Sequence, residues 1–220
     1  YRTSASGVLA AFGIGLAVWL MAGALTDLAL KANLGKASPG IMLRRLTGLP
    51  RSVFGTAFAH FGLGITLLGI VATTTFSTES VLVMKPGESI RAGGYTLRFD
   101  RIDPFKGSNY TEERGWFTVL DDEGQPVTEL LSAKRFFPVR TMQTTEAGIR
   151  TFLFSQLYVS LGDPAPDNGL VVRIWWKPLV TLIWLGTVAM MAGGCLSLLD
   201  RRLRIGAPAR TKPAKVRAAA

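Results

Sequence analysis

The sequence is poor in cysteine, histidine and charge, and each shortage excludes a class of protein. Cys195 and His60 are the sole residues of their types among 220, so a disulfide framework or a cysteine-rich metal site within this chain is excluded. Only 18% of the residues are charged, below the roughly 25% of an average soluble chain, which argues against a purely soluble or disordered protein. The length predicts one or two domains. Because the first residue is Tyr1 rather than Met, we expect a segment of a longer protein.

The net charge of +10 is concentrated in two short segments. Residues 31–52 carry five Lys or Arg and no acid, and residues 201–220 carry seven and no acid, whereas residues 76–175 carry eleven basic and thirteen acidic residues. Nucleic-acid binding would require clustered charge on a folded face with stacking aromatics. Here the basic segments adjoin long apolar runs, which is typical of membrane topology. We therefore expect membrane lipid, and no nucleic acid, as a partner.

Three apolar runs are long enough to cross a membrane, namely residues 1–30, 53–75 and 176–199. About 20 apolar residues span a hydrocarbon core of about 30 Å, so each run predicts a transmembrane helix. The first run is too long for a cleaved signal peptide and has no clear cleavage site at its end. The positive-inside rule places the basic loop 31–52 and the basic tail 200–220 in the cytoplasm. Residues 76–175 then lie outside, with Trp175 and Trp176 expected at the membrane interface.

Residues 76–175 are predicted to form a β-rich module. Short runs of alternating apolar and polar residues are separated by turn signals such as Pro86-Gly87 and Gly93-Gly94. The sequence Asp121-Asp122-Glu123-Gly124 predicts a hairpin turn between two of them. Six or so such runs predict a small antiparallel all-β barrel or sandwich, a choice that the pattern leaves open. The expected strands are residues 80–84, 95–102, 115–121, 127–137, 156–162 and 169–175.

No catalytic constellation is visible in this β module. It contains no His and no Cys, and no serine in a nucleophile-elbow motif. The acidic pairs Glu112-Glu113 and Asp121-Asp122 are interpreted as solvated charge beside turns. The module is therefore expected to dock or scaffold partners and not to carry out a reaction.

His60 is the most informative residue of the sequence. It lies about seven residues into the second apolar run, where an ionisable group costs several kcal/mol unless it has a partner. Three roles stay open: a metal or haem-iron ligand, a hydrogen bond to a neighbouring helix, or a proton relay. Glycines recur around it every seven residues, and such small residues permit close approach of a helix or of a flat macrocycle; they are Gly55, Gly62 and Gly69.

Two further intramembrane residues have simpler explanations. Asp27, near the end of the first predicted helix, lies four residues before Lys31 and is expected to pair with it. Cys195, in the third predicted helix, is expected to act as a small packing residue because a thiol in lipid behaves as a small hydrophobe.

Four stretches together resemble the C-terminal part of the CcmF/CycK family of cytochrome c-type biogenesis proteins. They are AHFGLGITLLGI at 59–70, KPGESIRAGGYTLRF at 85–99, TEAGIRTFLFSQLYVSLGD at 145–163 and KPLVTLIWLGTVAMMAGGCLSLLDRR at 177–202. They occur in the same order as in the family and span most of residues 53–202. The likeness is specific, since each stretch is distinctive beyond its hydrophobicity.

The resemblance implies a role in haem attachment at the bacterial inner membrane. Such proteins take haem, as substrate, from the periplasmic chaperone CcmE and attach it to the Cys-x-x-Cys-His motif of apocytochrome c, in a complex with CcmH and CcmI. They also hold a b-type haem between two transmembrane histidines, and His60 matches the second of these. The resemblance thus implies that His60 is an axial ligand of haem iron, with the other ligand outside this segment. Residues 76–175 become a periplasmic module.

Two functions of different classes follow. In the first, the segment is part of a haem lyase in which the membrane haem, with quinol as its electron donor, reduces the incoming haem. The family's Trp-rich segment and periplasmic histidines are absent from this segment. The resemblance therefore implies that the catalytic platform lies elsewhere in the protein and that this segment supplies no catalytic residue. In the second, the segment is a non-catalytic membrane scaffold or haem-transport subunit whose β module binds partners.

Overall fold

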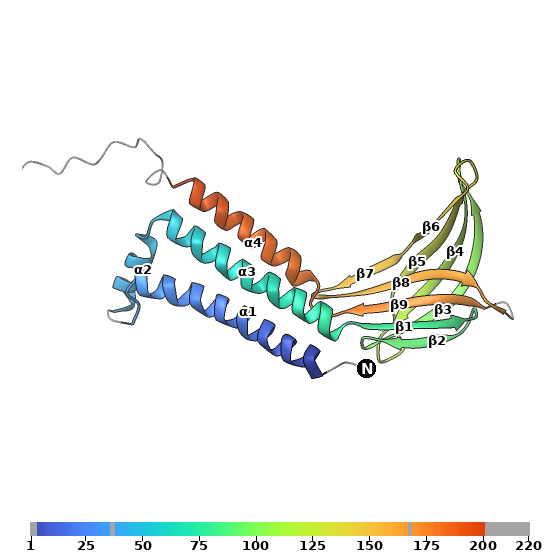
Figure 1. Cartoon of the computed structure of the whole chain (residues 1–220), viewed down its shortest axis with the longest axis horizontal. Coiled ribbons are helices and arrows are strands. Elements are labelled where there is room, and N and C mark those ends of the chain that lie inside the picture. Colours follow the sequence, from blue (N-terminus) through green and yellow to red (C-terminus); the bar gives the residue numbers. More distant parts are fainter. Residues whose placement is uncertain (1–3, 36–37, 167–168, 201–220) are drawn as a thin grey trace, which may run out of the picture. The chain divides into compact units, whose positions relative to one another are not determined.

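The structure is a computed structural model that describes residues 4–35, 38–166 and 169–200. Over these ranges the chain forms four helices and nine strands, and in the sequence all nine strands come between the third and fourth helices, as the labels of Figure 1 show. The helices are α1 (Ser4–Lys31), α2 (Pro39–Thr47), α3 (Arg51–Phe76) and α4 (Thr181–Leu198). The strands are β1 (Thr78–Met84), β2 (Ser89–Ala92), β3 (Tyr95–Lys106), β4 (Thr111–Leu120), β5 (Pro126–Phe137), β6 (Met142–Glu146), β7 (Gly148–Phe152), β8 (Ser155–Pro164) and β9 (Leu170–Lys177).

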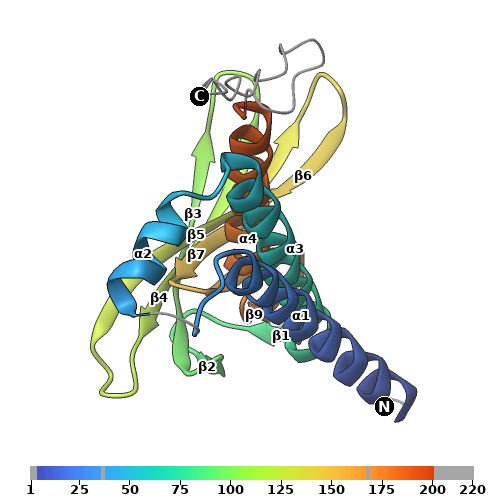
Figure 2. The same cartoon turned by 90° about the vertical axis from the view of Figure 1, so that its left-hand side faces the viewer.

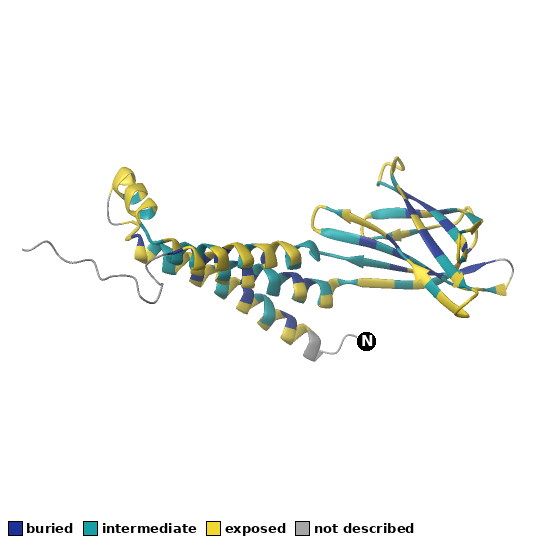
Figure 3. Ribbon diagram, turned by 90° about the horizontal axis from the view of Figure 1, so that it is seen from above, coloured by how far each residue is buried: buried dark blue, intermediate teal, exposed yellow. Residues whose placement is uncertain are grey.

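Three of the helices are long and apolar enough to cross a membrane. Their spanning segments are Gly7–Lys31, Arg51–Phe76 and Thr181–Leu198. Few of their residues are buried within this chain, and dark blue positions are sparse along them (Figure 3). Large apolar side chains such as Phe12 and Trp184 are exposed instead, as expected of helices whose surroundings are lipid or further protein. The prediction of three transmembrane helices is confirmed.

Two predicted boundaries differ from the structure. The loop 31–52 contains the short helix α2, which the proline signals: Pro39 occupies the first turn, where the missing N–H costs nothing, and Ser38 before it is extended. The third spanning helix begins at Thr181 instead of residue 176, because β9 continues to Lys177 in register with its neighbours. Pro178 then ends the strand, and Leu179 adopts a left-handed φ of 55° before the helix.

The β module is a sandwich of two antiparallel sheets and not a closed barrel. One sheet has the order β1-β9-β8-β7 and the other the order β2-β3-β4-β5-β6. Alternate residues of the central strands, such as β3 and β8, point inward, as a two-faced sheet requires. The core is the set of these inward residues from both sheets, chiefly Met84, Leu97, Phe99, Phe117, Val119, Leu157, Val159, Val172 and Ile174.

Two contacts illustrate how this core is closed. The rings of Phe99 and Phe117, opposite one another on β3 and β4, stack with centroids 4.8 Å apart. The buried Ser132 hydroxyl on β5 donates to the Glu146 carbonyl oxygen and accepts from the Leu161 N–H of the other sheet, at 2.8 and 3.1 Å. Because the buried hydroxyl both donates and accepts, this serine links the two sheets without leaving an unpaired polar group.

The six predicted strands are present, and so is the hairpin turn. Asp121 N–H donates to the Gln125 carbonyl at 3.0 Å, the Asp121 carboxylate accepts from the Gln125 N–H, and Gly124 has a φ of 78°. The sequence missed β2, β6 and β7. β6 has no buried residue, and a strand with two exposed faces has no apolar alternation to reveal it.

The glycines of α3 pack against α4, which runs beside it in both cartoon views (Figures 1 and 2). Two of these contacts lie in one compact unit, residues 19–64 with 186–220. A Cβ added to Gly55 would lie 2.5 Å from the carbonyl oxygen of Gly193, and a Cβ added to Gly62 would lie 2.6 Å from the carbonyl oxygen of Gly186. In the other unit a Cβ on Gly69 would meet Ile183 at 2.8 Å. Of the two roles left open for these glycines, helix packing is the one observed.

A matched pair of substitutions on α4 measures this packing. Gly193→Ala places a Cβ 2.5 Å from the Gly55 carbonyl oxygen, whereas a Cβ on Gly194 meets no atom within 4 Å. We expect Gly193→Ala to destabilise the full-length protein by about 1–3 kcal/mol, the usual cost of overpacking, and Gly194→Ala to have almost no effect. Denaturant unfolding in detergent measures both, and equal effects at the two positions would contradict the packing described here.

Candidate functional site

His60 lies on the side of α3 away from the glycines. It is five residues after Gly55 and two before Gly62, which at 3.6 residues per turn places it on roughly the opposite face. The glycines face α4, and so His60 does not. Its side chain is exposed among the described residues. The imidazole therefore points away from α4 and keeps an accessible surface within this segment.

One ring nitrogen of His60 is held by its own helix. The Nδ1 atom is 2.9 Å from the backbone carbonyl oxygen of Thr56, one turn earlier. A carbonyl oxygen can only accept, so Nδ1 carries the proton in this hydrogen bond. In the neutral ring Nε2 then has a free lone pair, and no other hydrogen bond of this side chain occurs within the described residues. This is the tautomer in which a histidine binds a metal through Nε2 while a backbone carbonyl fixes its orientation.

A cavity of about 400 Å³ lies in front of His60 between α1 and α3. Its wall is mostly apolar, with Asp27 as the one acid that reaches it. Asp27 pairs with Lys31 at 2.7 Å, four residues on, as predicted. The lining residues are Trp19, Leu20, Gly23, Ala24, Asp27, Thr56, Ala57 and His60. An imidazole with a free Nε2 at the edge of an apolar cavity fits an axial ligand of a haem iron.

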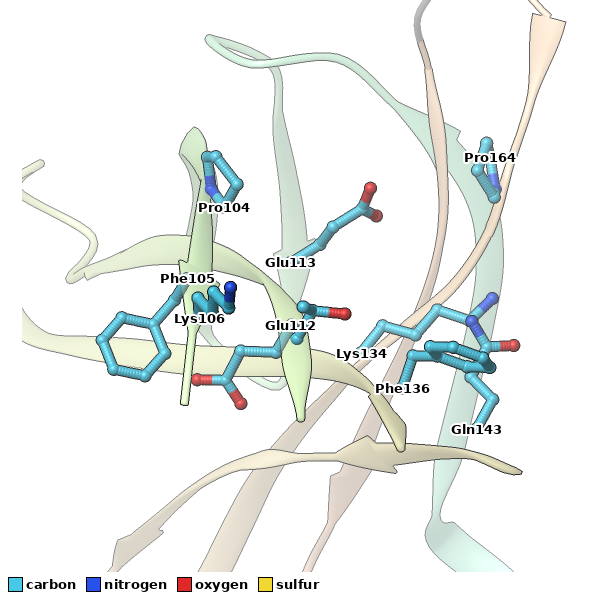
Figure 4. Close-up of a pocket in the computed structure, with 10 residues that line it drawn as sticks. Pro104, Phe105, Lys106, Glu112, Glu113, Lys134, Phe136, Gln143 and Pro164 are labelled. Atoms are coloured by element: carbon cyan, nitrogen blue, oxygen red, sulfur yellow. The ribbon is translucent and has the colours of Figure 1, made fainter. Parts of the chain in front are cut away.

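The β module contains a second group of interacting charges that the sequence did not reveal. Glu112 is buried at 4% exposure on β4, and its two carboxylate oxygens accept from Nε of Arg114 and Nε of Arg135, each at 2.6 Å. Arg135 also pairs with Glu146 on β6. Figure 4 shows the Glu112 carboxylate directed away from that of Glu113, beside a cavity of about 490 Å³.

The prediction that Glu112-Glu113 is solvated turn charge was therefore wrong for Glu112. The pair lies within β4, where successive side chains point to opposite faces, so one acid is buried and the other exposed. Burial raises the pKa of the Glu112 carboxyl, but the hydrogen bonds from Arg135 and Arg114 outweigh it and leave the pKa below its ordinary value. Because both carboxylate oxygens are already engaged, this cluster is a structural element and not a general acid.

The remaining predicted residues occupy ordinary positions. Cys195 on α4 is exposed within this segment, so its expected packing contact is absent from the described residues. Trp175 and Trp176 are strand residues: Trp175 meets the Tyr158 ring edge-on, and Trp176 lies against Gly93. No group of three or more metal-binding side chains occurs in the described part of the chain. His60 is thus the one predicted site residue whose surroundings favour a ligand.

The fold and this site define a class: a polytopic membrane protein with a β-sandwich inserted between two spanning helices and an outward-facing intramembrane histidine. Comparison with known proteins gives the family. Residues 75–178 match the family described as the CcmF C-terminal beta-sandwich. The chain belongs to the CcmF/CycK family of cytochrome c-type biogenesis proteins, and the sandwich corresponds to the C-terminal domain of that family.

Individual relatives agree with this assignment. The cytochrome c-type biogenesis protein CycK of Rhizobium meliloti (strain 1021) is 59% identical over 214 residues, which is 97% of this chain and 32% of CycK. CcmF of Pseudomonas aeruginosa is 35% identical over 199 residues, 90% of this chain and 30% of CcmF. The solved structure of a cytochrome c haem lyase CcmF has the same fold, with a TM-score of 0.60 at 16% identity over 88% of this chain and 40% of its own. This chain thus spans about a third of the length of the curated relatives.

Proposed function

We propose that this chain is the C-terminal part of a cytochrome c haem lyase. The whole protein would receive haem from the periplasmic chaperone CcmE and promote its thioether attachment to apocytochrome c. Within it, His60 would be one axial ligand of a membrane b-type haem whose other histidine lies outside this segment. One observation supports this role most: the His60 ring has its Nδ1 bound to the Thr56 carbonyl, which leaves Nε2 free beside the cavity between α1 and α3.

The residues of this chain would act by orientation and exclusion of water. The Thr56 carbonyl holds the ring in the tautomer with Nε2 unprotonated. The apolar cavity wall, with Trp19 and Leu20 from α1, would help to keep water from that nitrogen in the whole protein. A haem held there through His60 would supply redox chemistry, passing an electron from a donor that we propose to be quinol to the incoming substrate haem.

The sandwich would lie in the periplasm and dock partner subunits. The basic residues between α1 and α3, such as Arg44 and Arg45, and the basic tail after α4 support a cytoplasmic position for those segments. The sandwich, inserted between α3 and α4, would then lie on the other side of the inner membrane. Its paired strands and interlocked charges suit a rigid docking surface for CcmH and CcmI, or a cover over the haem site.

Complementation tests the proposed function. In a bacterium whose gene for this protein is deleted, we expect c-type cytochromes, detected by haem staining, to be absent and to return when the full-length gene is supplied. A second gene, in which residues 78–177 are replaced by a short linker, should fail to restore them although the protein is inserted in the membrane. Full maturation without the sandwich would exclude the docking role, and full maturation without the gene would exclude the lyase role.

A further inference from the structure

We propose that the turn between β7 and β8, Leu153 and Phe154, is a membrane anchor that inserts into the lipid interface beside the first turn of α4. The inference goes beyond the proposed haem chemistry. It rests on the three membrane-spanning helices and on contacts within one compact unit, residues 1–18 with 65–185. Its partner is the headgroup and upper acyl region of the bilayer.

The turn presents apolar side chains where a soluble hairpin would have polar ones. Leu153 is 78% exposed and Phe154 40% exposed, side by side in a tight loop. Leu153 also has a φ of 47°, a left-handed conformation that glycine or asparagine adopts at lower cost in such turns. Residues held in such a strained backbone conformation cluster at functional contacts, and Leu153 is one of them at the tip of a loop.

Hydrogen bonds hold this turn close to the ends of two spanning helices. The Thr181 N–H, at the first residue of α4, donates to the Phe154 carbonyl oxygen at 3.3 Å. The Thr73 hydroxyl, in the last turn of α3, donates to the Pro178 carbonyl oxygen at 3.3 Å. The turn is thus attached at the point where the chain enters the spanning helix α4, and Leu153 extends from that point.

The turn shares a cavity wall with the acidic turn Asp121-Asp122-Glu123, but farther along β8 and β9 the side chains have the composition of a membrane interface. Tyr158 and Trp175 meet edge-on with ring centroids 4.8 Å apart, and Nζ of Lys177 lies 5.4 Å from the Tyr158 ring. Tyr, Trp and Lys are the residues that concentrate at the headgroup level, since each joins an apolar body to a polar tip. Phe76, at the end of α3, is also half exposed. This apolar tip, which is hydrogen-bonded to the start of α4 and lies on the same sheet as these residues, favours lipid as the partner.

Spin-label accessibility tests the proposal in the full-length protein, reconstituted in phosphatidylcholine nanodiscs with its native cysteines, Cys195 included, replaced by serine. A nitroxide is attached at Leu153→Cys and, as a matched control on another exposed turn, at Val139→Cys, where the side chain is 92% exposed. We expect the label at residue 153 to collide more with oxygen, which partitions into lipid, than with a water-soluble nickel chelate. The label at residue 139 should show the reverse preference.

Each other outcome at residue 153 overturns the proposal. Preferential collision with the nickel chelate would place the turn in water. Low collision with both probes, with an immobilised spectrum, would place it against another part of the protein. A Leu153→Asn variant gives an independent measurement, because it relieves the backbone strain yet removes the apolar contact. Nitroxide at Phe154→Cys in that variant should lose most of its preference for oxygen, and an unchanged preference would contradict an anchoring role for Leu153.

Discussion

His60→Ala in the full-length protein is expected to remove the b-type haem spectrum of the purified protein and to reduce cytochrome c maturation to background. The reason is geometric: the Thr56 carbonyl engages Nδ1, so the free Nε2 is the atom available to an iron, and alanine offers no replacement. The measurement is the reduced-minus-oxidised visible spectrum of the detergent-purified protein, together with haem staining of the cells.

Two controls separate ligation from a general loss of structure. Cys195→Ala, at an exposed position of another spanning helix, should retain the haem spectrum. His60→Gly leaves space for free imidazole, and adding imidazole should restore part of the absorption band if the lost group is an iron ligand. A His60→Ala protein with the haem content of the wild type would refute the assignment.

Glu112→Ala is expected to destabilise the sandwich by about 3 kcal/mol. The substitution leaves the guanidinium groups of Arg114 and Arg135 without their shared carboxylate, and breaking a buried ion pair costs about 3–5 kcal/mol. We place the effect at the lower end because the two arginine side chains remain 27% and 21% exposed. Hydrogen exchange of the β4 and β5 amides in the full-length protein measures the change in opening free energy.

The neighbouring acid is the matched control for this prediction. Glu113→Ala, on the exposed face of the same strand, should change the opening free energy by less than about 0.5 kcal/mol. Lowering the pH should also destabilise the sandwich through Glu112. The pKa of its carboxyl in the folded state lies below the ordinary 4.5. The stability that the ionised carboxylate contributes is therefore present above pH 4.5 and is lost as the pH falls through the lowered pKa. Equal effects of Glu112→Ala and Glu113→Ala would show that the arginine contacts are not stabilising.

The fold was largely predictable because most elements bury one face. Strand β3 alternates apolar and polar residues over Tyr95–Asp100, and the spanning helices are long apolar runs, so length and period identify them. β6 and α2 were missed because neither has a buried residue. The end of β9 was missed because Trp175 and Trp176 suit a membrane interface and a strand equally, and pairing with β1 and β8 decides between them.

The candidate site was also only partly predictable from the sequence. His60 stands out in the sequence because an ionisable group within an apolar run is costly and rare. The direction in which His60 faces could not be predicted, because the small residues around it could have packed against a macrocycle or against α4. The Glu112 cluster was not predictable, because Arg135 is 23 residues away and meets Glu112 only in the register of β4 and β5.

A redox titration of the His60→Met protein tests the central claim most directly. Methionine can replace histidine as an axial ligand, and a His/Met pair gives a haem a higher reduction potential than a bis-histidine pair. If Nε2 of His60 binds the iron, His60→Met should retain haem and raise its potential relative to the wild type. A variant that retains its haem with an unchanged potential would show that the iron is bound elsewhere.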